Sequence, residues 1–178
     1  MMKPGKWLVV LAACVALPWG AAWGKEVRKM NGLQLTSSAF ANGGAIPAAY
    51  TCDGGDRNPP LAMANVPAGT RSLALIMDDP DAPVGLWVHW VLWNIHPRTS
   101  QVGENSVPDG ATQGRNSWGR AGYGGPCPPS GTHRYFFKLY ALDTILNLGT
   151  GTTKADLERA MEGHIIAKAE LMGTYKRR

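Results

Sequence analysis

Four short apolar runs, separated by segments rich in glycine and proline, restrict the folds open to this chain. The runs cover residues 33–37, 73–77, 89–95 and 135–142, and each is rich in aliphatic, β-branched or aromatic residues. Gly, Pro, Asn or Asp bound every run, which is typical of β-strands that end in turns. Turns should be abundant, because the 178 residues include 22 glycines and 13 prolines. The pattern predicts a mainly β protein.

The C-terminal part of the chain adds one helix and one further strand. Thr153 followed by Asp156 resembles a helix capping box, an apolar helical face follows, and Gly163 can end the helix. Residues 165–172 then alternate between a less polar and a more polar face, as a strand does. We therefore predict an antiparallel β-sandwich with one or two short helices.

The N-terminus has the layout of a secretory signal peptide. Lys3 and Lys6 precede an apolar run at residues 7–17, and small residues follow. The run is shorter than the roughly 20 residues needed to span a bilayer. We predict a cleaved signal peptide at residues 1–24 and a single domain at residues 25–178, periplasmic or secreted, with no stable membrane span.

Two alternatives to cleavage after Gly24 are an uncleaved N-terminal anchor and a lipoprotein modified at Cys14. The second is the weaker, because no small-residue lipobox leads into Cys14. Basic residues cluster only at residues 176–178, whereas nucleic-acid binders carry basic stripes, so we expect no nucleic-acid partner.

Two cysteines remain after the predicted cleavage, Cys52 and Cys127. Export would deliver them to an oxidising compartment, where such a pair persists as a disulfide. The functional alternative is a reactive Cys127 beside His133, for which no third, orienting group can be identified. We expect the Cys52–Cys127 disulfide.

Two aspartates follow the second apolar run. Asp79 and Asp81 alternate with prolines, which lack the N–H that a strand ladder needs, so the strand must stop here. The prolines make the loop rigid, and the Ala82–Pro83 bond is a candidate for the cis form. An Asx-rich turn that only ends a strand is the structural alternative.

His89 opens the next strand only a few residues later, so it should lie near this loop and reach one of the aspartates. A carboxylate bonded to one ring nitrogen would fix the tautomer and leave the other nitrogen facing a ligand. Strict strand alternation places His89 on one face with Val91 and Trp93.

A second loop, residues 124–132, leads into the fourth apolar run. Its glycines allow a ligand to approach the backbone and can present N–H groups to an anion, while its prolines hold the shape. His133 and Tyr135 share one strand face, whereas Arg134 points the opposite way and suits a structural ion pair. A surface loop without a ligand is the alternative.

Taken in order, these segments resemble the signature segments of the phosphatidylethanolamine-binding protein family, and more narrowly its bacterial and archaeal Raf-kinase-inhibitor-like branch. The matching stretches are Asp79-Pro80-Asp81-Ala82-Pro83, His89-Trp90, Gly125-Pro126-Cys127-Pro128-Pro129 and Gly131-Thr132-His133-Arg134-Tyr135. Residues 50–54 and 173–175 also match, so the resemblance covers nearly the whole chain after the predicted signal peptide.

The resemblance implies a β-sandwich with a small cavity at one end, which holds phosphate, acetate or the head group of phosphatidylethanolamine. By position, the ligand-binding residues would be Asp79, Asp81, His89, Gly125, Pro128, His133 and Tyr135. Members of the bacterial branch often form homodimers, so a homodimer is implied as well. Compared with eukaryotic members, this chain has Cys127 in place of a glycine and stops without the C-terminal helix that borders their pocket.

Two carboxylates would repel a simple anion, so the aspartates are better suited to contact the histidines than to contact the ligand. Asp79 or Asp81 would raise the pKa of a neighbouring imidazole, while His133, the Tyr135 hydroxyl and loop N–H groups face a phosphate. A remaining carboxylate could meet an ammonium group. The expected ligand is a small anionic or zwitterionic molecule, such as phosphate or a phosphoethanolamine-like head group, bound without a cofactor.

Three other functions are compatible with the sequence. An Asp and His pair is a common acid/base unit, but no nucleophile motif such as G-x-S-x-G occurs, so we predict a binding protein with no catalytic residue. Asp79, Asp81, His89 and His133 could instead form a hydrolase or metal site, although their spacing matches no metal motif. A secreted inhibitor or regulator of a partner kinase or protease would act through surface loops.

Overall fold

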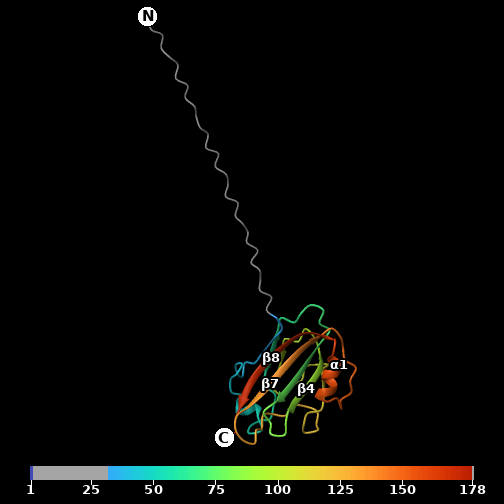
Figure 1. Ribbon diagram of the computed structural model, residues 1–178. Helices are drawn as coiled ribbons and strands as arrows, with labels where there is room; N and C mark the ends of the chain where they lie inside the picture. Colours follow the sequence, from blue (N-terminus) through green and yellow to red (C-terminus); the bar gives the residue numbers. More distant parts are fainter. Residues whose placement is uncertain (2–31, 178) are drawn as a thin grey trace.

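The computed structural model describes Met1 and residues 32–177 and contains two antiparallel sheets packed face to face (Figure 1). The smaller sheet has the order β1-β2-β5, with bounds Gln34–Thr36, Leu61–Ala64 and Gln101–Val102. The larger has the order β6-β4-β3-β7-β8, with bounds Thr112–Gln113, Trp87–Ile95, Ser72–Asp79, His133–Leu142 and Ile165–Tyr175. Two short helices are η1 (Ala48–Tyr50) and α1 (Lys154–Met161). The predicted β-sandwich is confirmed, and the predicted signal peptide lies outside the described residues apart from Met1.

The main core lies between the two sheets, because alternate residues of each strand point inward. Leu75, Trp90 and Phe137 of the larger sheet are fully buried there, against Leu61 and Met63 of the smaller one. No helix in the described residues is long and apolar enough to cross a membrane.

Helix α1 covers part of the opposite face of the larger sheet, beside β4 (Figure 1). Reciprocal hydrogen bonds between Thr153 and Asp156 form the predicted capping box. Leu157 and Met161 are fully buried against the sheet. Strand β3 is therefore buried along its whole length, including the two aspartates at its end.

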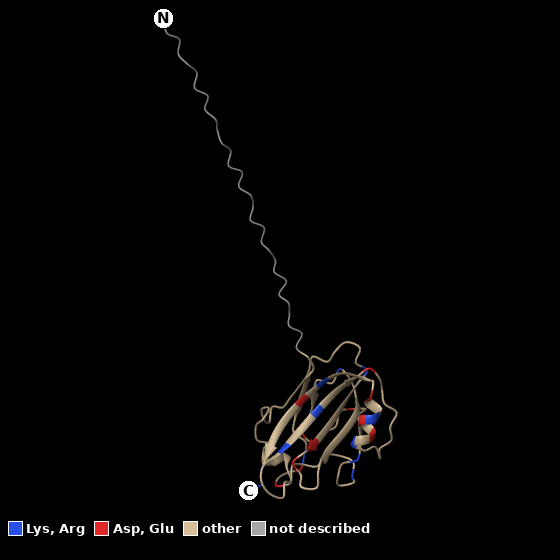
Figure 2. Cartoon of the chain, in the orientation of Figure 1, with Lys and Arg blue, Asp and Glu red and all other residues tan. Residues whose placement is uncertain are grey.

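These two aspartates point to opposite faces of the sheet. Asp78 is fully buried on the α1 side, where Lys138 Nζ lies 2.8 Å from both carboxylate oxygens and Lys154 Nζ lies 3.8 Å from one. Figure 2 shows charged residues of both signs along this part of the sheet and on α1. A buried carboxylate must be paired, so this ion cluster fixes Asp78 on the α1 side. Asp79 lies on the opposite face and points to the end of the sandwich.

The loop after β3 differs from the sequence-based expectation in one respect. The Ala82–Pro83 bond is trans, because no cis peptide bond occurs among the described residues. The chain reverses instead at Gly85, whose φ of 94° is left-handed and whose N–H donates to the Ala82 carbonyl at 2.9 Å. The candidate cis bond is therefore not formed, and the chain turns at a glycine.

Candidate functional site

A pocket of about 300 Å³ opens at the end of the larger sheet, where β3 ends and β4 and β7 begin. It is lined by Asp79, Ala82, Pro83, Val84, Trp87, His89, Trp118, Cys127, Pro128, Pro129 and His133. The walls are mostly apolar, and one carboxylate and two imidazoles supply the ionisable groups. A larger groove of about 890 Å³ beside the end of β8 contains no histidine, so the smaller pocket matches the predicted site better.

Asp79 holds His133 in one orientation. Asp79 is only 3% exposed, and its Oδ2 lies 2.7 Å from His133 Nδ1. Its Oδ1 accepts a hydrogen bond from the Asp81 N–H at 2.8 Å. Because an ionised carboxylate only accepts, His133 Nδ1 carries a proton, and the other ring nitrogen, Nε2, remains available to a ligand.

A β-bulge turns His89 toward the same pocket. In the ladder between β3 and β4, Trp90 and Val88 pair with consecutive residues of β3, so His89 is an extra residue without a partner. The prediction that His89 shares a face with Val91 and Trp93 is wrong, because the bulge breaks the alternation. Val91 and Trp93 pack under α1, whereas His89 lines the pocket.

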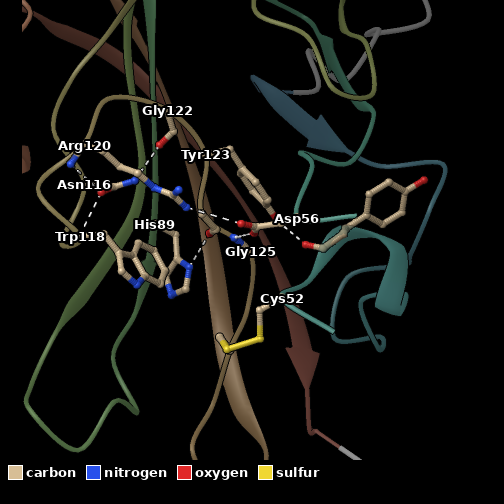
Figure 3. A network of polar contacts seen from close by, with 12 residues as sticks. Cys52, Asp56, His89, Asn116, Trp118, Arg120, Gly122, Tyr123 and Gly125 are labelled. Carbon is tan, nitrogen blue, oxygen red and sulfur yellow. Dashed lines mark hydrogen bonds and ion pairs between the residues drawn. A yellow bond between two sulfur atoms is a disulfide. The ribbon is translucent and has the colours of Figure 1, made fainter. Parts of the chain in front are cut away.

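His89 is held by a backbone carbonyl. Its Nδ1 lies 2.7 Å from the Gly124 oxygen, which can only accept, so Nδ1 carries the proton of the neutral ring (Figure 3). Burial lowers the pKa of His89, and this effect exceeds the opposing effects of the Gly124 carbonyl and the Asp79 charge. The expected rise in imidazole pKa is therefore wrong for His89. The neutral ring presents Nε2 as an acceptor.

Tyr135 lies behind the two imidazoles and does not line the pocket. Its fully buried ring meets the His89 ring edge-on with centroids 5.2 Å apart and stacks on the His133 ring at 6.5 Å. The Tyr135 hydroxyl makes no hydrogen bond with any described residue. Burial, followed by the charge of Asp79, raises the pKa of Tyr135 well above its usual range, so the phenol is neutral.

Asp81 points away from the pocket and pairs with Arg134. The Arg134 side chain donates to the two carboxylate oxygens at 2.8 and 2.6 Å, and its backbone N–H donates at 2.9 Å. The ion pair predicted for Arg134 is confirmed. These hydrogen bonds lower the pKa of Asp81 to about 2. Asp81 therefore fixes the loop and does not line the pocket.

We expect Asp81→Asn to reduce thermal stability at neutral pH but not in strong acid. Because the pKa of Asp81 falls from 3.8 to about 2 on folding, its carboxylate stabilises the fold above pH 3.8, and that stabilisation is lost as the pH falls through 2. The melting temperatures of wild type and Asp81→Asn should differ at neutral pH and converge near pH 2. Asp109→Asn, at an exposed loop carboxylate, is the control and should match wild type throughout. A difference that stays constant across this range would contradict the assignment.

Gly125 lies behind the pocket and joins two loops. Its N–H donates to Asp56 Oδ1 at 2.6 Å, so it is already bonded and not free for an anion. A Cβ atom here would lie 2.7 Å from the Tyr50 carbonyl oxygen, which explains the glycine. In the network of Figure 3, Arg120 Nη2 also reaches Asp56, at 3.5 Å, and Tyr123 Oη donates to the Tyr50 carbonyl at 2.8 Å.

The Cys52–Cys127 disulfide is confirmed and forms part of the pocket wall (Figure 3). It joins segments 75 residues apart in sequence. The Cys52 N–H also donates to the Pro126 carbonyl at 3.1 Å. Since Cys127 has no free thiol, the alternative of a reactive cysteine beside His133 is wrong for this structure.

The structure thus brings together four of the seven predicted ligand-binding residues: Asp79, His89, Pro128 and His133. It places Asp81, Gly125 and Tyr135 around them without exposing them to the pocket. Within the described residues, no three His, Cys, Asp or Glu side chains are arranged to hold a metal ion.

The aromatic side of the pocket was not predicted from the sequence. The Trp87 and Trp118 rings meet edge-on with centroids 5.4 Å apart, and Trp118 lies 5.1 Å from the His89 ring. Trp118 sits in a glycine-containing turn at residues 116–119. A large aromatic residue in such a turn was the signal that could have revealed it, because aromatic side chains are usually buried in strands.

The fold and the site define a class: a two-sheet β-sandwich with a small pocket of two histidines and one aspartate at the end of its larger sheet. The model of the phosphatidylethanolamine-binding protein family matches residues 36–176, and the chain belongs to this family.

Relatives from archaea and bacteria agree with this assignment. A UPF0098 protein of Methanothermobacter thermautotrophicus is 52% identical over 150 residues, covering 82% of this chain and 99% of the relative. A solved phosphatidylethanolamine-binding protein homologue from Chlamydia trachomatis has a TM-score of 0.81 at 48% identity, covering 83% of this chain and 99% of its own. YbcL from E. coli, described as a member of the mammalian family, has a TM-score of 0.78 at 33% identity, covering 83% of this chain and 100% of its own.

Proposed function

We propose that this chain binds a small anionic or zwitterionic ligand, such as phosphate or a phospholipid head group, in the histidine pocket. One observation carries the proposal. Two imidazoles, one fixed by Asp79 and one by the Gly124 carbonyl, line the same small cavity with their Nε2 atoms uncommitted. The name of the family to which the chain belongs supports the same class of ligand.

The hydrogen-bonding character of the two histidines restricts the kinds of ligand that fit the pocket. The neutral His89 ring accepts at Nε2, whereas a charged His133 ring donates at Nε2. The buried charge of Asp79 opposes a simple dianion. A matching ligand therefore offers both an acceptor oxygen and a donor, as does a singly protonated phosphate monoester or a phosphate linked to an ammonium group.

Binding is proposed in preference to turnover. Among the described residues no serine or threonine lines the pocket, and the Cys127 sulfur is bonded to Cys52, so neither histidine faces a side-chain nucleophile there. A periplasmic or secreted location is proposed as well, and the disulfide supports it because such bonds persist in oxidising compartments.

Isothermal titration calorimetry with phosphate, acetate and phosphoethanolamine tests the proposal. We expect His133→Gln to weaken binding roughly tenfold, because a charge-assisted hydrogen bond is lost.

His164→Gln is the matched control for this titration. His164 Nδ1 lies 2.8 Å from Asp143 Oδ1, which repeats the His133 and Asp79 pair on the surface. This variant should bind all three ligands as wild type does. An absence of binding heat for wild type with every ligand, or an equal loss in His164→Gln, would refute the proposed function.

A further inference from the structure

A single peptide group connects His89 to Asp56. The Gly124 carbonyl lies 2.7 Å from His89 Nδ1, and the Gly125 N–H donates to Asp56 Oδ1 at 2.6 Å (Figure 3). This carbonyl and this N–H belong to the same peptide unit, which is planar, so they point in opposite directions. The orientation of one peptide group therefore decides both hydrogen bonds.

The chain on either side of this peptide is fixed. The Gly124 N–H donates to the His89 carbonyl at 3.0 Å, and the Pro126 carbonyl accepts from the Cys52 N–H at 3.1 Å. The peptide itself lies between two glycines, which have no Cβ atom to oppose its rotation. A half-turn of the peptide within this frame would exchange the positions of its carbonyl and its N–H.

The charge of Asp56 favours one of these two orientations. In the observed orientation the carboxylate faces an N–H donor, whereas a rotated peptide would turn the Gly124 carbonyl oxygen toward it. Two acceptors that face each other repel. The rotated peptide would also present the Gly125 N–H to His89 Nδ1, so Nδ1 would accept and the neutral ring would carry its proton on Nε2.

Asp56 occupies a backbone conformation that asparagine adopts elsewhere in this chain. Its φ is 47°, in the left-handed region, and the other non-glycine residues with positive φ among those described are Asn65, Asn94 and Asn105. Both asparagine and aspartate tolerate this region. The turn itself therefore gives no reason for a negative charge at this position.

We propose that Asp56 is a positioning residue, which acts through the Gly124–Gly125 peptide to keep His89 Nε2 a hydrogen-bond acceptor. The pocket then requires a donor from the ligand at this nitrogen, such as an ammonium group or a protonated phosphate oxygen. Asp56 does not line the pocket, so it sets specificity without contacting the ligand. The effect on specificity rests on the proposed function, whereas the state of the His89 ring can be measured without a ligand.

Nitrogen-15 chemical shifts of the imidazoles test this assignment. Residues 25–178 can be used, because the solved Chlamydia trachomatis relative has this fold and the match covers 99% of that chain and 83% of this one. At a pH above the histidine range, wild-type His89 should carry its proton on Nδ1. In Asp56→Asn the amide can meet either face of the peptide, so the share of rings protonated on Nδ1 should fall to about half.

Asp53→Asn is the matched control, because it makes the same chemical change three residues earlier in the same loop. The Asp53 carboxylate accepts instead from Tyr175 Oη at 2.7 Å and Arg177 Nε at 3.0 Å. This variant should leave the His89 signals as they are in wild type. The His133 signals should not move in either variant, which shows that the pocket is folded.

Arg120→Gln separates the role of the peptide from that of the ion pair. Arg120 Nη2 lies 3.5 Å from Asp56 Oδ2, and this contact is the other explanation for the charge of Asp56. The two side chains are 58% and 41% exposed, and such pairs contribute little. The variant keeps the hydrogen bond from Gly125, so the His89 ring should remain protonated on Nδ1.

Asp56→Asn should also change which ligands bind best. When about half of the His89 rings no longer accept at Nε2, the affinity for phosphoethanolamine should fall about twofold. The affinity for acetate, which offers no donor at neutral pH, should not fall. Calorimetry with both ligands on wild type and Asp56→Asn measures this ratio.

The outcomes keep this inference apart from the proposed function. An unchanged His89 ring in Asp56→Asn overturns the positioning role, as does an equal change in Asp53→Asn or Arg120→Gln. A change of tautomer in Asp56→Asn without binding heat for phosphoethanolamine in wild type supports the positioning role and refutes the proposed ligand. Binding by wild type, with an unchanged ring in Asp56→Asn, overturns the positioning role and leaves the proposed function intact.

Discussion

Replacing Cys52 and Cys127 together with serine should lower the free energy of unfolding by about 4 kcal/mol. The disulfide closes a segment of 75 residues, and its loss returns conformational entropy to the unfolded chain. The effect should appear as a lower midpoint of urea unfolding, followed by circular dichroism on residues 25–178, which contain no other cysteine.

The same double substitution should weaken ligand binding. Cys127 lines the pocket together with Pro128 and Pro129, and the bond to Cys52 ties this wall to the segment after η1. A wall that is free to move must be ordered by the ligand, which reduces the affinity measured for phosphoethanolamine.

Reduction supplies the control for this prediction. Dithiothreitol should move wild type to the urea midpoint of the double serine variant and should leave that variant unchanged. If the variant unfolds at the same urea concentration as oxidised wild type, the bridge does not stabilise the fold.

The strands were predictable because their signal is local. The long strands β3, β4, β7 and β8 carry many apolar residues between turn residues, so composition and alternation identify them without tertiary information. The strands β2, β5 and β6 have two to four residues, too few to show a period, and they exist because they pair with neighbours.

The sequence predicted which residues belong to the site better than it predicted what each of them does. His133 needed only alternation to face Asp79, whereas His89 reaches the pocket through a bulge set by how β4 pairs with β3. That pairing cannot be predicted from the local sequence. Asp81 looked equivalent to Asp79, and only the position of Arg134 after folding separates a surface ion pair from a pocket carboxylate. Trp118 was missed for the same reason, since its hairpin packs on residues distant in sequence.

Asp79→Asn should both destabilise the fold and change the hydrogen-bonding pattern of the pocket. The carboxylate accepts from two N–H groups, those of His133 and Asp81. An amide has one oxygen, so either rotamer sets its NH₂ group against one of these donors. With the His133 proton on Nδ1, a donor facing a donor in this buried site costs about 1–3 kcal/mol, which sets the largest fall expected in the urea midpoint.

The His133 ring can relieve this conflict by moving its proton from Nδ1 to Nε2. In the variant, Nδ1 would then accept from the Asn NH₂ group, and Nε2 would donate to the pocket in the neutral ring. Nitrogen-15 chemical shifts of the imidazole should report the change of tautomer. Because the change of tautomer alters what His133 offers a ligand at Nε2, the affinity for acetate should change as well.

Asp143→Asn makes the same chemical change at the exposed His164 pair, where both side chains are about half exposed. Water can satisfy the groups released there, so stability should change by less than about 0.5 kcal/mol and acetate binding should not change. If Asp79→Asn leaves the His133 nitrogen shifts and the urea midpoint at their wild-type values, the Asp79 carboxylate does not orient this histidine. The pocket would then need another explanation for the fixed direction of its second imidazole.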